Sequence, residues 1–338
     1  MKRHGDLYRK IINEENLKLA YQKSRKGKAW QRNVKEIDQR QEYYLSELLR
    51  ILQNKEYKTS QYKTKMIYEP KVRTIYILPY YPDRILQHAI MNVLEPIWDK
   101  LFIYDSYACR QGKGQHKGSL RCMQFVKRNK YCLKCDISKF YPSVNHEKLL
   151  KIIKRKIKCK DTLVLLEEII NSIEGESNVP IGNYLSQWFG NLYMNELDQL
   201  IKHKYHIKDY IRYCDDFLLF SNSKEKLNQM KLIIEKFITE QLKMKLSKCD
   251  LFPVTQGVDF LGYRHFPQGY ILLRKTTAKR VKKRLKSLFW KVKHKKISKE
   301  SAISTIASTK GWLRWANTHN MSLSLKIMEL ETEIKEYE

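Results

Sequence analysis

The sequence predicts an α+β protein built as one continuous body with several lobes. Apolar residues recur at helical spacing in residues 1 to about 60 and again near the C-terminus, and short β-leaning runs lie between these regions. No Gly/Ser-rich or Pro-rich linker and no internal repeat divides the 338 residues. A chain of this length allows two or three such lobes.

Charge narrows the range of partners. The 66 Lys and Arg residues exceed the 36 Asp and Glu residues and leave a formal charge of +30, which indicates a polyanionic partner. The 22 tyrosines offer faces for stacking on bases or sugars, so nucleic acid leads, ahead of an anionic membrane or a merely solvated surface. No apolar run approaches the ~20 residues that span a bilayer, and MKRHGDLYRK lacks a signal-type apolar segment. We therefore expect a soluble, cytoplasmic protein with no membrane partner.

The seven cysteines are expected to be free thiols in a reducing compartment, because an odd number scattered over a long chain does not suit a disulfide framework. Cys132 and Cys135 form a CxxC pair, but there is no second pair. The apolar, β-leaning context YCLKCDI favours a strand over a zinc site.

The first part of the chain is expected to contain the following elements. Residues 1 to about 60 form a basic helical N-terminal extension. The segment KTKMIYEPKVRTIYIL predicts a hairpin whose two runs flank Glu69–Lys71. DRILQHAIMNVLEPIWDKLF has the spacing of an amphipathic helix with Asp83 as its N-cap. The cationic segment SYACRQGKGQHKG follows and, taken alone, is typical of a flexible solvated loop.

The later elements centre on acidic residues. Residues 131 to 137 predict a buried strand ending at an acid, and residues 146 to 175 predict helices. DYIRYCDDFLLF, residues 209 to 220, predicts a strand, a tight turn and a second strand. The β-rich VDFLGYRHF precedes a strongly basic helix from Thr276 to Lys296, in which Lys and Arg surround one apolar face.

Asp136, Asp215 and Asp216 are the candidate metal ligands. Adjacent carboxylates are costly to bury unless a cation compensates them. Mg²⁺ suits this role because it accepts carboxylate and phosphate oxygens together. If the strand ending at Asp136 lies beside the hairpin, the three carboxylates share one cluster of two ions, as nucleotidyl transfer requires. An ordinary Asx-type turn is the alternative for Asp215 and Asp216.

Several motifs in order resemble the reverse transcriptase family. YCDD at Tyr213–Asp216 resembles its YxDD box, and CDISKFYPSVNH its first catalytic-aspartate motif. LSKCDLFPVTQGVDFLGY resembles the lysine-bearing segment and primer grip, and EPKVRTIYILPYYPDRILQHA the fingers segment that meets the incoming triphosphate. The resemblance runs from about Lys63 to about Phe266, with a weaker tail to Asn320.

The resemblance implies a right-hand polymerase fold with fingers, a palm bearing an antiparallel sheet, and a helical thumb. The implied divisions are a helical N-terminal extension (1–60), fingers (61–125), palm (126–265, with 146–179 helical and partly fingers) and the motif-E exit with the thumb (266–338). The implied substrates are dNTPs, a template RNA and the RNA/DNA hybrid.

Residue roles carry over from the resemblance by position. Asp136 and Asp215 are implied as the principal ligands of two Mg²⁺ ions, for which Mn²⁺ is a substitute, with Asp216 assisting. Tyr141, at the position of an aromatic ring against the sugar, implies dNTP preference, with core packing as the alternative. The residues implied in dNTP binding are Lys71, Arg73, Ile137, Tyr141, Gly182 and Lys248. The cations expected along the nucleic-acid backbone are Arg110, Lys113, Lys117, Lys279, Lys282, Lys283 and Lys286.

PIGNYLSQ, residues 180 to 187, narrows the resemblance to the bacterial or phage reverse transcriptases of diversity-generating retroelements. Its Ile181, Gly182, Ser186 and Gln187 replace the polar QG pair and later SP of most bacterial relatives. Gly182 is expected to let the backbone approach the nascent base pair or template. Ile181 removes an amide, so we expect looser control of the template base and misincorporation at adenines.

The subtype implies partners and leaves alternatives open. Enzymes of this type work with a template-repeat RNA and a small basic helical accessory protein that forms a ring. A defence-associated reverse transcriptase with its own noncoding RNA is the closest alternative. A non-catalytic RNA-binding scaffold and an RNA-dependent RNA polymerase are further alternatives, although the latter family usually carries GDD at the metal turn.

Overall fold

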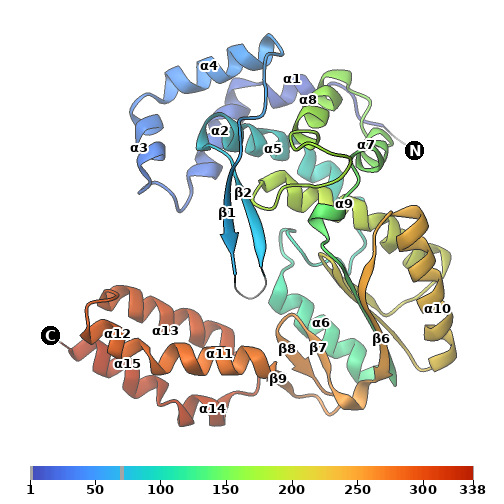
Figure 1. The fold of residues 1–338 in the computed structure, drawn as a ribbon, viewed down its shortest axis with the longest axis vertical. Helices are drawn as coiled ribbons and strands as arrows, with labels where there is room; N and C mark the ends of the chain where they lie inside the picture. The colour runs from blue at the N-terminus through green and yellow to red at the C-terminus, as the bar shows by residue number, and fades with distance from the viewer. Residues whose placement is uncertain (1–2, 69–71, 338) are drawn as a thin grey trace.

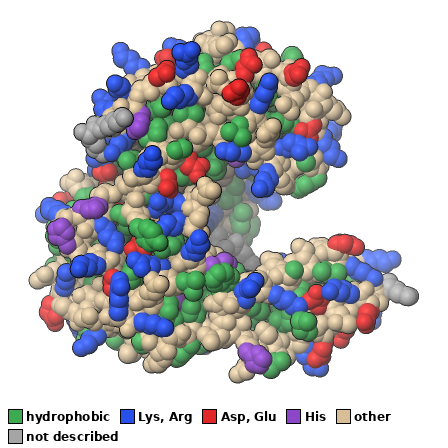
Figure 2. All heavy atoms as spheres, turned by 180° about the vertical axis from the view of Figure 1, so that it is seen from behind, with side chains coloured by type: hydrophobic (Ala, Val, Ile, Leu, Met, Phe, Trp, Pro, Cys, Tyr) green, Lys and Arg blue, Asp and Glu red, His purple; other side chains and the backbone are tan. Residues whose placement is uncertain are grey.

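The computed structural model describes residues 3–68 and 72–337. In Figure 1 the N-terminal helices form the top of the molecule, a sheet with its helices forms one side, and a C-terminal helical lobe lies below. The space-filling view from behind shows a deep cleft between the upper part and the C-terminal lobe (Figure 2). The β1–β2 hairpin projects from the upper part toward this cleft (Figure 1).

The N-terminal extension is helical, as predicted. Its helices are α1 (Leu7–Ile11), α2 (Glu14–Arg25), α3 (Arg32–Gln39) and α4 (Gln41–Gln53). The side chain of Asn13 caps α2 by accepting a hydrogen bond from the amide of Asn16. The buried residues of these helices belong to the same hydrophobic core as α5 (Ile85–Asp99) and the central sheet. The extension is therefore packed into the body rather than attached to it.

The predicted hairpin is present as β1 (Lys63–Ile67) and β2 (Arg73–Ile77), which pair antiparallel from Lys63↔Ile77 to Ile67↔Arg73. Its tip, with Glu69, Pro70 and Lys71, lies outside the described residues. All of β1 is exposed.

The helix predicted after the hairpin is α5, but Asp83 is not its N-cap. Arg84 occupies the cap position without a capping side chain, after a π-helical turn at Tyr80–Arg84. The carboxylate of Asp83 is buried and accepts hydrogen bonds from the Tyr57 hydroxyl at 2.8 Å and the Ser60 amide at 3.1 Å. Asp83 thus anchors the segment that leads into the hairpin, a contact that local spacing does not reveal.

The central sheet is antiparallel with the order β4-β5-β3-β6. The strands are β3 (Tyr131–Ile137), β4 (Tyr210–Tyr213), β5 (Asp216–Ser221) and β6 (Leu246–Pro253). Alternate residues face opposite sides. One side packs in the main core with α9 (Tyr184–Gln199) and α10 (Lys224–Lys236), and the other packs on α6 (Gln115–Arg128). Helices α7 (His146–Lys154) and α8 (Lys160–Ile170) fall within the predicted helical region.

Two of the expected boundaries fall within or beside elements that pack together. Helix α6 lies across the expected fingers–palm boundary at residue 125 and contributes Cys122, Phe125 and Val126 to the core under the palm sheet. A small sheet crosses the expected palm–thumb boundary at residue 265; its strands are β7 (Val258–Phe260), β8 (Tyr263–His265) and β9 (Ile271–Leu273). In both places packing joins segments that local composition separates.

The C-terminal lobe is helical and has its own hydrophobic core. Its helices are α11 (Lys275–Lys286), α12 (Leu288–Lys293), α13 (Lys299–Leu313), α14 (His319–Ser324) and α15 (Ile327–Glu336). The single basic helix expected from Thr276 to Lys296 is divided at Ser287, whose hydroxyl donates to the carbonyl of Arg284. The break lets Leu288 and Val292 enter the core of this lobe.

Candidate active site

The structure brings the three predicted aspartates to one end of the central sheet. Asp136 is the penultimate residue of β3, and Asp216 begins β5. These strands are adjacent, and their last aligned pair is Cys135↔Phe217, one position before the two aspartates. Asp215 lies with Cys214 in the tight turn that joins Tyr213 to Asp216. The predicted strand, turn and strand are confirmed.

Asp216 is electrostatically strained. Its Oδ1 is buried without a hydrogen-bond partner, and its Oδ2 lies 3.6 Å from Lys134 Nζ. Burial, and then the negative charges of Asp136 and Asp215, outweigh the effect of Lys134 and raise the pKa of Asp216 to about 6. Since both causes penalise the ionised form, the site is short of positive charge.

The donor chemistry at this end of the sheet fits a hard divalent cation. It offers carboxylate oxygens, of which Asp216 Oδ1 is buried without a hydrogen-bond partner. A bound cation would also lower the raised pKa of Asp216. Asp136 Oδ2 accepts a hydrogen bond from Ser247 Oγ at 2.8 Å, which orients it. Within residues 3–68 and 72–337, no group of three or more His, Cys, Asp or Glu side chains is already gathered closely enough to hold a metal ion.

The cysteines of the described chain are free thiols. Cys132 and Cys135 are buried in β3, and burial raises the pKa of the Cys132 thiol. The Sγ atom of Cys135 lies 3.2 Å from that of Cys249 on the neighbouring strand. The CxxC pair is thus part of a strand, as its context indicates.

Tyr141 lies beside the turn at Cys214 and Asp215. Burial raises the pKa of its hydroxyl, and the nearby thiols of Cys214 and Cys109 and the carboxylate of Asp215 add to this effect. Gly190 of α9 makes room for the neighbouring rings of Phe140 and Tyr141. A Cβ at this position would lie 2.9 Å from Phe140 Cε1 and 3.3 Å from Tyr141 Cε1. Sequence reasoning missed Gly190. The signal that could have identified it is a glycine inside the apolar helix WFGNLY.

The PIGN segment contacts the hairpin. Gly182 has φ of 125°, and a Cβ there would overlap the carbonyl oxygen of Tyr76, well inside 3.0 Å. The amide of Tyr76 donates to the carbonyl of Ile181 at 2.7 Å. The expectation that Gly182 makes room for a base pair or template therefore needs correction: in this structure the close neighbour is the backbone of β2.

The other predicted residues of this segment differ in exposure. Ile181 is half-buried, and Gln187 is exposed at the start of α9. The hydroxyl of Ser186 is buried and donates to the carbonyl of Pro180 at 2.7 Å. Ser186 therefore holds the segment closed against its own helix.

The predicted dNTP contacts that the structure describes include residues on three strands. Arg73 is exposed at the start of β2, whereas Lys71 lies outside the described residues. Ile137 is buried at the end of β3. Lys248 is exposed on β6, directly across from Asp136. The structure thus places Lys248 beside Asp136.

The predicted backbone-binding cations divide into two groups. On α11 all of them are exposed, while Thr277 and Leu285 form the buried face; the exposed lysines are Lys279, Lys282, Lys283 and Lys286. Figure 2 shows Lys and Arg side chains on both rims of the cleft. The loop cations are more constrained: Lys113 Nζ lies 3.4 Å from the centre of the Tyr104 ring, and Lys117 Nζ donates to the carbonyl of Gly112 at 2.7 Å.

Arg110 is a correction to the predicted nucleic-acid contacts. Its side chain is only 9% exposed and pairs with Asp99 at 2.6 Å. It also donates to the carbonyls of Ile103 and Ser106. Through these internal contacts the Arg110 guanidinium holds the loop against the body of the protein. The loop is therefore not the open, solvated segment that its composition predicts.

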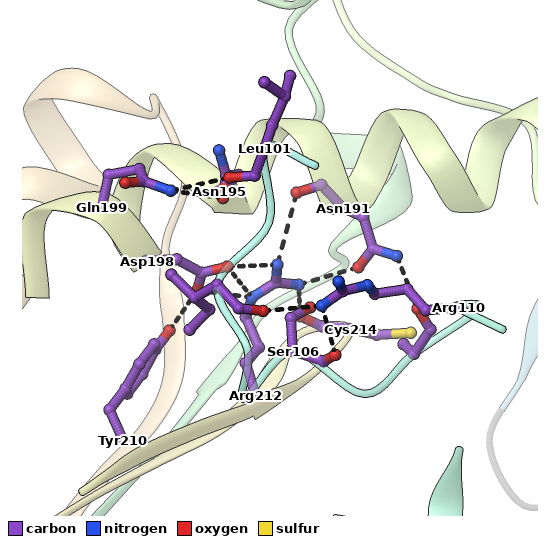
Figure 3. A network of polar contacts seen from close by, with 12 residues as sticks. Leu101, Ser106, Arg110, Asn191, Asn195, Asp198, Gln199, Tyr210, Arg212 and Cys214 are labelled. Carbon is purple, nitrogen blue, oxygen red and sulfur yellow. Dashed lines mark hydrogen bonds and ion pairs between the residues drawn. The ribbon is translucent and has the colours of Figure 1, made fainter. Parts of the chain in front are cut away.

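A buried ion pair that sequence reasoning missed lies next to the turn at Cys214 (Figure 3). Arg212 on β4 and Asp198 on α9 have 0% side-chain exposure and approach to 2.6 Å. Burial lowers the pKa of Arg212, but Asp198 more than offsets this and holds the pKa above its usual value. The sequence signal is a charge in each of two apolar elements, YIRY and MNELDQL.

Comparisons with known proteins show the family of the chain. The sequence profile of the family described as reverse transcriptase (RNA-dependent DNA polymerase) matches residues 58–265. Protein YkfC of Escherichia coli K12 is 25% identical over 235 residues, which cover 55% of this chain and 61% of that protein. The group II intron-encoded protein LtrA of Lactococcus lactis subsp. cremoris is 22% identical over 262 residues, 55% of this chain and 43% of LtrA.

Solved structures of telomerases are similar to this chain at low identity. Apo telomerase from Candida tropicalis has a TM-score of 0.48 and 13% identity, covering 82% of this chain and 63% of that one. Candida albicans telomerase with a fragment of telomeric RNA has a TM-score of 0.47 and 14% identity, covering 83% and 61%. No helix in the described parts of the chain is long and apolar enough to cross a bilayer.

Proposed function

The chain belongs to the reverse transcriptase (RNA-dependent DNA polymerase) family and has its right-hand polymerase fold, and from this premise we propose that it extends a DNA primer on an RNA template with dNTPs. One observation carries the proposal. Asp136, Asp215 and Asp216 meet at one end of adjacent palm strands, where Asp216 has an orphaned buried oxygen.

Asp136, Asp215 and Asp216 are proposed to hold two Mg²⁺ ions, with Mn²⁺ as a substitute. When bound, the ions lower the pKa of the primer 3′-hydroxyl and neutralise the leaving pyrophosphate. The chain's own residues orient these ligands: Ser247 holds Asp136, and Lys134 lies beside Asp216.

The triphosphate is proposed to bind between the palm and the hairpin. Arg73 and Lys71 reach its phosphates from the hairpin, as cations do in other phosphoryl transfers. Lys248, across from Asp136, and the backbone at Ile137 line the palm side. Tyr141 excludes a 2′-hydroxyl, because its ring is held beside the turn and has little room to withdraw. Equal use of rNTPs and dNTPs in primer extension would contradict this role.

The RNA/DNA hybrid is proposed to lie in the cleft along α11. Lys279, Lys282, Lys283 and Lys286 are exposed there and can pair with phosphates without reading sequence. Lys113 contributes from the loop before α6, and Lys117 from the first turn of α6, once the ring contact of Lys113 and the hydrogen bond of Lys117 are released.

The diversity-generating type is the finer proposal. It is supported by Ile181 and Gln187, which stand where most bacterial relatives have the Gln of QG and the Pro of SP, and by the backbone hydrogen bond between Ile181 and β2. That bond joins the backbone at Ile181, whose side chain is proposed to face the template base, to the strand proposed to bind the triphosphate. Ile181→Asn should then lower misincorporation opposite adenine, whereas an unchanged error spectrum in sequenced cDNA would remove the idea.

The proposed setting is the cytoplasm of a bacterium, with a template-repeat RNA and a small basic helical accessory protein that forms a ring. A defence-associated reverse transcriptase with its own noncoding RNA is the alternative. A template repeat and a mutated variable gene beside the coding sequence favour diversification, and a defence island without them favours the alternative.

The test is primer extension by the purified chain with RNA template, DNA primer, dNTPs and Mg²⁺, with and without the neighbouring accessory protein. We expect extension that disappears in Asp215→Ala and persists in a control variant, Lys55→Gln, which changes a surface pair with Asp161. Template-primer binding without Asp215-dependent extension would instead support the non-catalytic scaffold.

A further inference from the structure

We propose that Arg212 is a positioning residue for the catalytic turn: held by α9, its guanidinium fixes the carbonyl of Cys214 and so directs the carboxylate of Asp215. The inference rests on the proposed function, because it takes Asp215 as a metal ligand of the polymerase reaction. It assigns a task to a buried charge pair that stability alone does not require, since such pairs are often replaceable by apolar residues.

The geometry of Arg212 leaves its guanidinium one orientation (Figure 3). Nε donates to Asp198 Oδ1 at 2.8 Å, and Nη2 donates to Asp198 Oδ2 at 2.6 Å. A planar guanidinium fixed at these two nitrogens has no freedom left at the third. Nη1 then donates to Asn191 Oδ1 and to the Cys214 carbonyl, each at 3.0 Å.

The turn that receives this hydrogen bond is conformationally strained. Cys214 has φ of 54°, in the left-handed region that residues other than glycine seldom adopt. Such conformations persist where the surroundings over-determine them. The Arg212–Cys214 bond connects the core to the peptide that immediately precedes Asp215. Without it, this peptide can relax toward an ordinary turn and swing the Asp215 carboxylate away from Asp136.

Helix α9 supports both the turn and the proposed sugar gate. Asn191 and Asp198 on α9 orient Arg212, and Gly190, the residue before Asn191, lies against the rings of Phe140 and Tyr141. Asn191 also donates to the carbonyl of Ala108 at 2.9 Å, which fixes the segment beside β4. A change at Arg212 should therefore alter the chemical step while template binding and the sugar gate stay intact.

The decisive variant is Arg212→Lys in the full chain. Lysine keeps a charge for Asp198 but offers one compact ammonium, which cannot also reach Asn191 and the Cys214 carbonyl in a fixed fork. Single-turnover extension of a DNA primer on RNA should slow at least about tenfold at saturating dNTP. The dNTP concentration for half-maximal rate, and primer-template affinity measured by fluorescence anisotropy in EDTA, should stay within about twofold.

The matched control is Tyr210→Phe. It removes a 2.6 Å hydrogen bond to the same Asp198 carboxylate and leaves the Arg212–Cys214 bond in place. Its extension rate should stay within about twofold of the unaltered chain. A rate loss as large as that of Arg212→Lys would mean that any disturbance of the pair slows the enzyme, which would overturn the positioning role.

A second variant separates positioning from stability. Tyr210→Phe/Asp198→Leu/Arg212→Met replaces the ion pair and its phenol with apolar side chains of similar size, a change that proteins often tolerate. We expect a melting temperature close to that of the unaltered chain and a rate as low as that of Arg212→Lys.

The proposal is overturned if Arg212→Lys or the triple variant folds and extends the primer at an unaltered rate. It is also overturned if neither of these two variants folds, because the ion pair is then required for stability. If the unaltered chain shows no Asp215-dependent extension, the proposed function itself fails. An active chain with a normal Arg212→Lys rate overturns the positioning role alone.

Discussion

The palm turn and the fingers hairpin are two strand pairs that are held in opposite ways. The interior of β5 is buried, and a buried ion pair supports the turn before it. In contrast, β1 is exposed along its whole length, and Tyr76 of β2 is held by a hydrogen bond from its amide to the Ile181 carbonyl and by one from the Asn178 side chain to its hydroxyl. The aspartates thus lie at the end of a buried strand pair, whereas the hairpin has little buried surface of its own.

This contrast predicts which property a mutation in each region should change. Changes at the palm end should alter the chemical step or its electrostatics, because packing leaves its groups few alternative positions. Changes at the base of the hairpin should alter the contact between β2 and the segment at Ile181 and Gly182. Changes on α11 should weaken binding gradually, because its lysines are separate, solvated charges.

The largest effect is expected at Asp136. Asp136→Asn keeps the hydrogen bond from Ser247 available but removes the charge, so the extension rate should fall by about 10³-fold, the scale of losing one catalytic electrostatic group. Primer extension at saturating Mg²⁺ measures this loss. Ser247→Ala, which only frees the carboxylate, should cost far less, and a comparable loss there would show that orientation dominates charge.

The next prediction concerns the contact between Gly182 and the hairpin, which we call the joint. Gly182→Ala places a Cβ on the Tyr76 carbonyl and should lower the free energy of unfolding by about 1–3 kcal/mol. The Tyr76 amide should also exchange faster with solvent. Gly112→Ala is the matched control, because it has φ of 73° but open space around it. Equal destabilisation in both variants would mean that backbone strain, not the joint, explains the loss.

The third prediction concerns pH. The pKa of Asp216 is about 6 in the folded chain, above its usual value of 3.8, so the folded state binds more protons between these values. Stability should therefore be highest below about pH 4 for this group, decline as pH rises to about 6, and stay reduced above it, by about 3 kcal/mol.

Asp216→Asn is the variant that tests this pH dependence. Urea titrations from pH 4 to 8 should show a flatter profile for Asp216→Asn than for the unaltered chain. Added Mg²⁺ should stabilise the unaltered chain more than Asp216→Asn at pH 7, since the ion would relieve the charge shortage. Parallel pH profiles would contradict the raised pKa.

The smallest effects are expected on α11. Lys279→Gln or Lys283→Gln should weaken hybrid binding modestly, and each should reduce the slope of log affinity against log salt by about 1 or less. Salt titrations of fluorescence anisotropy measure the slopes. Lys151→Gln, which removes a surface pair with Glu147 on α7, serves as the control and should leave the slope unchanged.

Prediction from the sequence succeeded where the signal is local. The hairpin alternation, the strand ending at Asp136 and the two short runs around Asp215 each correspond to structure. It failed where a side chain serves a distant partner. Asp83 resembled a helix cap but binds Tyr57 and Ser60, and Arg110 resembled a solvated cation but pairs with Asp99.

By itself, the sequence determined the order of elements, the acids at the end of the palm strands and the cationic character of α11, because these follow from neighbouring residues and their spacing. Only the tertiary structure decided which groups meet. Gly182 contacts the hairpin rather than the expected base pair or template, Gly190 makes room for Tyr141, and Arg212 supports the Cys214 carbonyl. These meetings join segments far apart in the chain, and such contacts depend on packing that local patterns do not encode.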